Sequence, residues 1–321
     1  MIIVPEKEIA DLIDRKASFD AVESVFAAMA QKDAYNFPVI RESIGYADAL
    51  YGFKSGFDKA GLALGLKSGG YWPGNMAKGL TNHQSTVILF DPDTGKVKAL
   101  VGGNLLTALR TAAASAVSIK YLAPKGAKVL GMIGAGHQSA FQMRAAAEQC
   151  NFEKVIGWNH NPENLHKLEK IAHEIGLPFE AVGLEQLGEH ADVIITITSS
   201  FDPILLDAHV TGGTHIACMG TDTKGKQEVE SALVARATVF TDEIAQSITI
   251  GECQHAVGDG SLKESDIIEL GSVITAKHVG RSFDDEITLF DGTGVGLQDL
   301  AVASAAVDLA IKKGVAIDVD F

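Results

Sequence analysis

Cysteine, basic side chains and long apolar runs are all scarce in this chain of 321 residues. The three cysteines, Cys150, Cys218 and Cys253, are too few and too scattered for a disulfide framework or a cysteine-rich metal site. Cys218 lies within an apolar run, where a buried thiol is the ordinary interpretation, and a reducing compartment fits this pattern. Disulfide-stapled and cysteine-metal proteins are therefore excluded as classes.

Acidic side chains outnumber basic ones by 41 to 27, which gives a net charge of −14. This charge repels polyanions, so no nucleic-acid partner is expected. No apolar run approaches the roughly 20 residues of a membrane span, and the first segment, MIIVPEKEIADLI, lacks the basic start of a signal peptide. We expect a cytoplasmic protein with no membrane partner.

The length favours two domains. Residues 18–33 have apolar side chains at helical spacing, with the helix expected to start near Ser18. After Asn36, short strand-like runs broken by glycine follow, and the turn DPDTG at 91–95 predicts a hairpin between two of them. Residues 105–122 predict an alanine-rich helix.

The segment KVLGMIGAGHQSA, residues 128–140, contains the most informative local pattern. A strand leads into Gly134 and Gly136 and then directly into a helix, the context in which a backbone approaches a pyrophosphate. Ser139 replaces the third glycine of the G-x-G-x-x-G pattern but is small enough for close packing. The pattern predicts dinucleotide binding, with His137 placed to contact phosphates.

Uniformly apolar strands alternate with amphipathic helices from this region onward, which predicts a parallel sheet covered on both faces. A last alanine-rich helix, 297–314, is expected to fold back onto the first domain. The predicted fold class is α/β: a Rossmann-type doubly wound parallel sheet, 125–296, inserted into a mixed α+β domain formed by 1–124 and 297–321.

The end of the second strand of this sheet bears on the choice of cofactor. An acidic residue there holds the 2′-hydroxyl of NAD, whereas arginine accepts the 2′-phosphate of NADP. This chain has Asn159, which can hydrogen-bond a ribose hydroxyl, and no arginine follows it. We therefore predict NAD(H), although His160 could assist a phosphate.

Asp222 comes soon after the apolar strand HIACMG. Ligands of open α/β sheets lie off the carboxyl ends of the strands, so Asp222 is a candidate catalytic residue, and turn capping is the alternative.

Lys67 and Arg110 stand among apolar or small residues, and Arg41 follows the segment NFPVI. Such cations usually pair with a carboxylate of the protein or bind a ligand, and three of them favour an anionic substrate. His83 is a further candidate for contact with substrate, and a purely structural place at a strand edge is the alternative. No catalytic triad of Ser, His and Asp and no metal site is expected.

Five segments in this order carry a family resemblance: LTALRTAAASAVSIKYLAP, GMIGAGHQSAFQMRA, ADVIITITSS, HIACMGTDTKGKQE and GTGVGLQDLAVA. Together they resemble the ornithine cyclodeaminase and mu-crystallin family over essentially the whole chain. The resemblance implies a homodimer in which a split dimerisation and substrate domain encloses a Rossmann domain.

The same resemblance implies site residues. Arg41, Lys67 and Arg110 match positions that hold the substrate carboxylate, and Asp222 matches the catalytic aspartate. Together with the glycine loop, the expected cofactor contacts are Thr111, Gly134, Gly136, His137, Gln138, Asn159, Ser199 and Val295.

Within the family, the segments DAYNFPV, TNHQSTV and TIGECQHA look like the subgroup that reduces iminosuccinate in the β-hydroxyaspartate pathway of glyoxylate assimilation. This implies NADH-dependent hydride transfer to the imine carbon of a small dicarboxylate, giving L-aspartate. Asp222 would stabilise the protonated nitrogen, Lys67 would polarise the carboxylate or supply a proton, and His83 would hold the second carboxylate. The alternatives are an ornithine cyclodeaminase-type enzyme, a cyclic-imine reductase or alanine dehydrogenase, and a non-catalytic, mu-crystallin-like NAD(P)H-dependent ligand binder.

Overall fold

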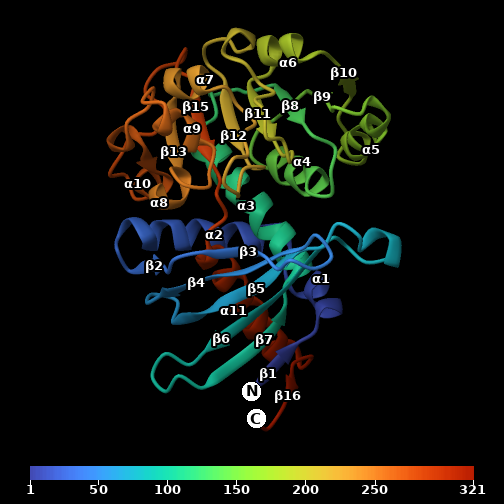
Figure 1. The fold of residues 1–321 in the computed structure, drawn as a ribbon, viewed down its shortest axis with the longest axis vertical. Coiled ribbons are helices and arrows are strands. Elements are labelled where there is room, and N and C mark those ends of the chain that lie inside the picture. The colour runs from blue at the N-terminus through green and yellow to red at the C-terminus, as the bar shows by residue number, and fades with distance from the viewer. The chain divides into compact units, whose positions relative to one another are not determined.

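The computed structural model describes residues 1–321 as two compact units (Figure 1). The first unit combines Met1–Arg110 with Val295–Phe321, and the second is Thr111–Gly294. Their first boundary falls within helix α3, Asn104–Leu122. The sequence predicts this boundary after the helix, at residue 124. The predicted domain bounds, 1–124 with 297–321 and 125–296, remain a prediction.

The first unit is built on a mixed eight-stranded sheet in the order β16-β1-β7-β6-β5-β4-β2, with β3 paired to β4. The turn at 91–95 joins two antiparallel strands, β6 and β7, as predicted. The strands are β1 Ile2–Val4, β2 Ala34–Asn36, β3 Ile40–Ser43, β4 Leu50–Asp58, β5 Ala63–Tyr71, β6 His83–Phe90, β7 Val97–Gly102 and β16 Ile317–Asp318. The helices are α1 Ile9–Leu12, α2 Arg15–Ala30 and α11 Gly296–Lys313, with 3-10 turns at Glu6–Glu8 and Met76–Lys78.

Helix α2 begins at Arg15, so the predicted start near Ser18 is wrong. The side chain of Asp14 accepts the N–H of Ala17 at 2.7 Å and caps the helix one turn earlier. Ser18 is instead buried inside the helix.

The C-terminal helix α11 packs on β4, β5 and β6, as predicted. Two glycines permit this close approach. A Cβ atom on Gly56 would lie 3.0 Å from the Leu297 side chain, and one on Gly65 would lie 3.1 Å from the Leu300 side chain. The helix therefore covers one face of the sheet, close to β4 and β5.

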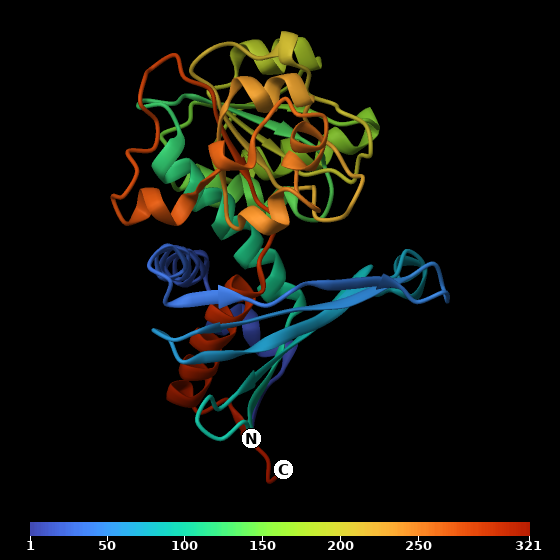
Figure 2. The ribbon, with the colours of Figure 1, turned by 60° about the vertical axis from the view of Figure 1, so that its left-hand side comes forward.

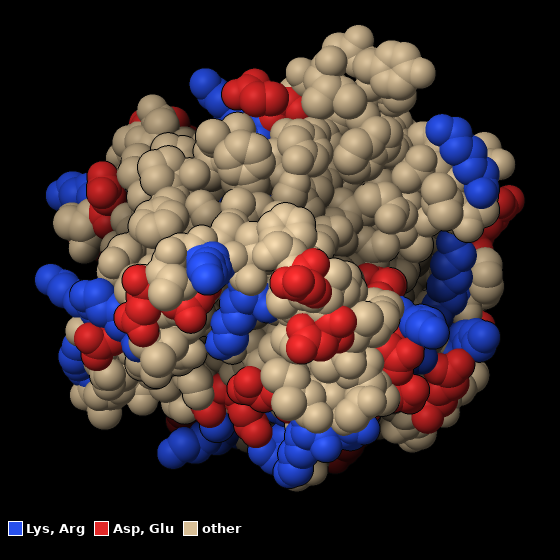
Figure 3. All heavy atoms as spheres, turned by 90° about the horizontal axis from the view of Figure 1, so that it is seen from below, with Lys and Arg blue, Asp and Glu red and all other residues tan.

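The other face of this sheet carries several exposed apolar side chains. Tyr51 and Phe53 project from β4 onto this face, and Ile40 of β3 lies opposite Phe53. These side chains are 39%, 37% and 46% exposed, which is high for residues of this size. In the view from below (Figure 3), uncharged side chains form a broad area in the upper part of the picture, while acidic and basic side chains alternate below it.

The second unit contains an eight-stranded sheet in the order β10-β9-β8-β11-β12-β15-β13-β14. All its pairings are parallel, which confirms the predicted doubly wound sheet. Helices surround this sheet (Figures 1 and 2). The strands are β8 Val129–Ile133, β9 Lys154–Trp158, β10 Phe179–Ala181, β11 Val193–Thr196, β12 His215–Cys218, β13 Thr238–Thr241, β14 Ile268–Glu269 and β15 Thr288–Asp291. The helices are α4 Ser139–Ala147, α5 Leu165–Glu174, α6 Leu184–His190, α7 Ser231–Arg236, α8 Ile244–Ser247, α9 Cys253–Gly258 and α10 Leu270–Ile274.

The strand order reverses between β8 and β11. From β8 the chain adds β9 and β10 toward one edge of the sheet, and from β11 it continues toward the other edge. Ligands of doubly wound folds bind at the carboxyl ends of the strands at such a reversal. The glycine loop follows β8, which places it at this point. None of the helices is long and apolar enough to cross a lipid bilayer.

Candidate active site

Three charged side chains form a buried cluster in the first unit. The Lys67 ammonium on β5 lies 2.9 Å from Oδ2 of Asp299, and Nε of Arg110 lies 2.9 Å from its Oδ1. Arg110 also donates to Oε1 of Gln298 at 3.1 Å. Lys67 and Arg110 are thus paired cations, as expected for buried charges, and a single carboxylate serves both.

The charges in this cluster change one another's pKa. Burial and the neighbouring Arg110 cation lower the pKa of Lys67 to about 7. Burial opposes ionisation of Asp299, but Arg110 and Lys67 outweigh it and hold the pKa of that carboxyl below its usual range. Asp299 is therefore a carboxylate, and Lys67 can gain or lose a proton near neutral pH.

Further basic side chains project from the same face of the sheet. Lys54 lies directly opposite Lys67, and Arg41 lies opposite Gly52, two residues before Lys54. His83 lies opposite Tyr71, four residues after Lys67. Because side chains alternate along strands, Arg41, Lys54, Lys67 and His83 share one face. The structure thus brings the predicted anion-binding residues together and adds Lys54.

The imidazole of His83 is neutral in this environment. Burial and the nearby Lys67 and Arg110 cations lower the pKa of His83 to about 4. A neutral imidazole can still donate one hydrogen bond to an anion. His83 therefore offers a hydrogen bond and adds no further positive charge.

The glycine loop of the second unit has the geometry that a dinucleotide requires. Gly134 has φ of +109°, and a Cβ atom there would lie 2.6 Å from the Ile197 carbonyl oxygen. A Cβ atom on Gly136 would meet nothing within 4 Å, so the loop borders open space. Helix α4 begins after Gln138 without a side-chain cap, and Oε1 of Gln138 is buried without a partner. The open space at Gly136 and the uncapped start of α4 fit an anionic group such as a pyrophosphate, whereas the Gln138 oxygen is an acceptor and does not contribute to binding it.

Asn159 follows β9 and holds the glycine loop. Its Oδ1 accepts the N–H of Ala135 at 2.9 Å, and its Nδ2 donates to the Asn161 carbonyl at 2.7 Å. The imidazole of His137 lies against the Phe141 ring, with 5.3 Å between the ring centroids. Asn159, which is expected to contact the ribose of the cofactor, therefore also stabilises the loop that precedes helix α4.

The remaining predicted cofactor residues lie in three different segments. Ser199 is exposed in the segment after β11, and Thr111 is buried in α3. Val295 is buried immediately before α11.

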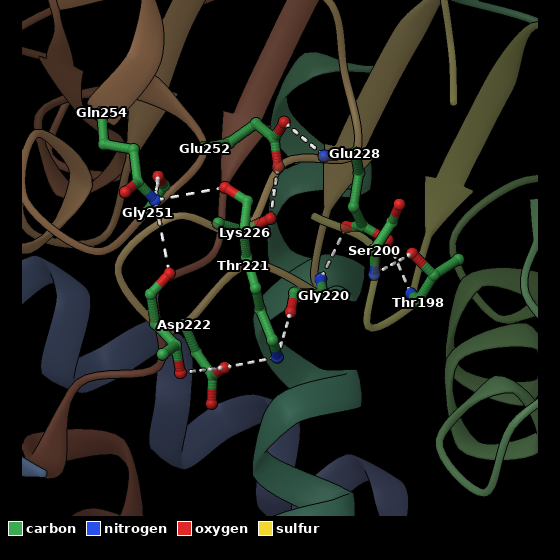
Figure 4. Close-up of polar contacts among 11 residues, drawn as sticks. Thr198, Ser200, Gly220, Thr221, Asp222, Lys226, Glu228, Gly251, Glu252 and Gln254 are labelled. Carbon is green, nitrogen blue, oxygen red and sulfur yellow. Dashed lines mark hydrogen bonds and ion pairs between the residues drawn. The ribbon is translucent and has the colours of Figure 1, made fainter. Parts of the chain in front are cut away.

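Asp222 lies in the loop after β12, and its carboxylate is one-third exposed (34%). Its Oδ1 accepts hydrogen bonds from the Lys226 ammonium at 2.9 Å and from the Thr223 hydroxyl at 3.2 Å (Figure 4). Lys226 also donates to the Gly220 carbonyl at 3.2 Å. The lysine fixes the carboxylate in an accessible position, where it is able to interact with a cation.

The sequence did not point to Asp299, although a signal was present: it is a lone carboxylate near the start of an alanine-rich, apolar helix. Lys226, Glu228 and Glu252 were also missed. They lie in polar stretches, GTDTKGKQE and TIGECQ, where no spacing distinguishes a buried acid from an exposed one.

The sequence model of the ornithine cyclodeaminase/mu-crystallin family matches residues 10–314. The chain belongs to this family. The family predicted from the sequence is therefore confirmed.

Among relatives in this family, the iminosuccinate reductase of Paracoccus denitrificans (strain Pd 1222) is 68% identical over 320 residues, which cover all of both chains. The crystal structure of the Paracoccus denitrificans enzyme in complex with NAD+ superposes with a TM-score of 0.97, covering 100% of this chain and 99% of that one. An archaeal alanine dehydrogenase, described as a dimer with bound NAD, is 30% identical with a TM-score of 0.94, again covering 100% and 99%.

Proposed function

We propose that this protein is an NADH-dependent imine reductase that converts iminosuccinate to L-aspartate. The observation that carries the proposal is the full-length identity of 68% to an iminosuccinate reductase whose structure contains NAD+. The reaction consumes iminosuccinate, NADH and a proton and yields L-aspartate and NAD+.

The cation cluster of the first unit suits a dicarboxylate substrate. On this face Arg41, Lys54, Lys67 and Arg110 contribute positive charge, and Asp299 neutralises only part of it. The guanidinium groups of Arg41 and Arg110 would orient the α-carboxylate by paired hydrogen bonds, which favours one approach to the imine carbon. His83 would donate to the second carboxylate.

Asp222 is proposed as the catalytic carboxylate. NADH, when bound, supplies the hydride that adds to the imine carbon. An iminium accepts hydride better than a neutral imine, and the carboxylate of Asp222 would stabilise that cation. Lys67 is a candidate donor of the proton, because its pKa of about 7 lets it release one near neutral pH.

The proposed cofactor is NAD(H), held by the glycine loop at Gly134 and Gly136 and by the start of α4. Support comes from the open space at Gly136 and the uncapped helix start. Thr111, His137, Gln138, Asn159, Ser199 and Val295 are proposed as its other contacts.

We further propose that the chain forms a homodimer in the cytoplasm and acts in glyoxylate assimilation, as the family resemblance implies. The apolar sheet face with Tyr51, Phe53 and Ile40 supports the dimer, because exposed apolar patches commonly mark interfaces. Sedimentation of the wild type and of a Tyr51→Lys/Phe53→Lys variant tests it. A dimeric wild type and a monomeric variant are expected, and a monomeric wild type would contradict the proposal.

The enzymatic proposal is tested by following NADH oxidation with oxaloacetate plus ammonia, which form iminosuccinate in solution. We expect aspartate in amounts equal to the NADH consumed, and no aspartate with Asp222→Asn, which should still bind NADH. Asp202→Asn, on a neighbouring exposed segment, is the matched control and should remain active.

Parallel assays separate the alternatives. Turnover with pyruvate and ammonia but not with oxaloacetate would indicate an alanine dehydrogenase. Formation of proline and ammonia from ornithine without net NADH consumption would indicate a cyclodeaminase. NADH binding without turnover of any substrate would indicate a ligand binder.

A further inference from the structure

Two glutamates that the proposed reaction does not use are completely buried beside the loop of Asp222 (Figure 4). Glu228 ends this loop, and Glu252 directly precedes α9. An ionised carboxylate in such a position is costly unless it accepts several hydrogen bonds. Both side chains accept several hydrogen bonds, but the donors are distributed differently over the two carboxyl oxygens.

Glu228 uses both of its oxygens for backbone N–H groups. Oε1 accepts from Thr198 at 2.6 Å, and Oε2 accepts from Gly220 at 2.8 Å and from the Thr196 hydroxyl at 2.8 Å. A backbone N–H can only donate, and a carboxylate accepts it more strongly than a protonated acid, so three donors on two oxygens favour the unprotonated form of Glu228. Glu228 therefore acts as a carboxylate that joins the segments after the neighbouring strands β11 and β12.

In Glu252, a single carboxyl oxygen accepts both backbone N–H groups. Its Oε1 accepts the N–H groups of Glu228 at 2.8 Å and Val229 at 2.7 Å, while Oε2 lies 2.5 Å from the Thr221 hydroxyl. A hydroxyl can either donate or accept, so Oε2 can carry a proton. Burial, followed by the charge of Glu228, raises the pKa of Glu252 to about 8. Burial also raises the pKa of Glu228, but its backbone donors favour the ionised form there.

The two glutamates anchor both ends of the Asp222 loop. At the start of the loop, Glu228 accepts the N–H of Gly220, and Glu252 binds the hydroxyl of Thr221. At the end of the loop, Glu252 accepts the N–H of Glu228. The middle is held from the α9 side, where Oε1 of Gln254 accepts the Gly225 N–H at 2.7 Å. The position of Asp222 therefore depends on this network.

We propose that Glu228 and Glu252 are positioning residues of the reaction: a carboxylate at 228 and a protonated acid at 252 together hold the Asp222 loop and the adjoining segment at Thr198 in the reactive arrangement. This inference rests on the proposed function, because the catalytic role of Asp222 is assigned there.

The pair predicts an asymmetric response to the same substitution. Glutamine has one acceptor oxygen and one donor group, which resembles a protonated glutamate. Glu252→Gln keeps the acceptor for its two N–H groups and can donate to the Thr221 hydroxyl. Glu228→Gln must leave the N–H of Thr198 or of Gly220 without an acceptor.

The experiment compares Glu228→Gln, Glu252→Ala and Glu252→Gln by steady-state kinetics, NADH titration and hydrogen exchange. We expect Glu228→Gln and Glu252→Ala to lower kcat by at least about tenfold. The KM for iminosuccinate should change less, because the cations assigned to it belong to the first unit. Amide exchange should accelerate at 196–200 and 219–224. Glu252→Gln should restore kcat to within about twofold of the wild type at neutral pH.

Glu230→Gln is the matched control, since this half-buried glutamate binds one backbone N–H, that of Asp207 at 2.8 Å, outside the loop. Equal effects of Glu228→Gln and Glu252→Gln, whether both small or both large, would overturn the inference. If the wild type reduces no iminosuccinate, the proposed function fails, while the exchange rates of the two segments still decide whether the glutamates hold the loop. If Glu228→Gln does not fold, the inference is tested by the comparison of Glu252→Ala with Glu252→Gln. Equal kcat values for these two variants would then overturn it.

Discussion

The Lys67 ammonium lies 2.9 Å from Oδ2 of Asp299, a carboxylate with no exposed surface. The same carboxylate pairs with Arg110 at 2.9 Å. Asp299 thereby fixes two cations from different elements, β5 and α3, on one side of the sheet. It also limits their mutual repulsion, so both can be available to an anionic substrate.

Substitution of Asp299 by Asn should destabilise the protein. The variant retains the shape of the side chain but leaves Lys67 and Arg110 buried without a counter-ion. Removing one partner of a buried ion pair typically lowers the free energy of unfolding by about 3–5 kcal/mol. Denaturant unfolding measures the effect. Asp308→Asn, an exposed site on the same helix, is the control, and equal stability of the two variants would contradict the role of Asp299.

Anion binding should weaken as the pH rises through about 7, the value to which burial and Arg110 lower the pKa of Lys67. Below this pH Lys67 carries a positive charge, and above it the amine is neutral. Succinate is fully ionised in this range, so its inhibition constant reports the protein alone. We expect that constant to increase above pH 7.

Lys67→Arg tests the assignment of this titration, because arginine stays charged over the whole range. The variant should bind succinate with a much smaller dependence on pH. An unchanged dependence would assign the titration to another group.

The sequence predicted best those features that depend on local chemistry. Gly134 and Gly136 follow an apolar strand and precede a helix, and the strand and the helix occur where the pattern placed them. The start of α2 was wrong because two capping residues, Asp14 and Ser18, compete within one turn. Only the geometry shows that Asp14 makes the bond.

Features that depend on tertiary contacts were harder to predict from the sequence. Asp299 is separated from Arg110 by 189 positions, and Lys54 meets Lys67 only through the register of two strands. The burial of Glu228 and Glu252 likewise arises from the packing of the second unit. The family resemblance supplied the roles of Arg41 and Asp222, which spacing alone left open.

A methyl group at Gly136 should weaken NADH binding without loss of stability. A Cβ atom there meets nothing within the chain, so the folded state has room for it. A pyrophosphate approaching the loop would meet this methyl group, and we expect the dissociation constant of NADH to rise at least about tenfold. Fluorescence titration of Gly136→Ala measures this.

Gly183→Ala is the control for that prediction. Gly183 also precedes a helix, α6, and its added Cβ atom also meets nothing within 4 Å. Similar NADH affinities for the two variants would show that the cofactor does not approach Gly136.

His83 should determine the preference for a dicarboxylate. Loss of a hydrogen bond to a charged group costs about 1.5–3 kcal/mol, so His83→Leu should lower kcat/KM for iminosuccinate by at least tenfold. The imine formed from pyruvate and ammonia lacks the second carboxylate and should be affected little. Thr86→Val, an exposed residue of the same strand, is the control.

The pH dependence of this preference distinguishes a neutral from a charged His83. Since burial and the nearby cations lower its pKa to about 4, the imidazole stays neutral between pH 6 and 8. The ratio of kcat/KM values for the two imines should therefore stay constant over that range in the wild type, once the ionisation of each imine is allowed for. A ratio that falls as the pH rises, and does so only when His83 is present, would mean that a charged imidazole binds the second carboxylate.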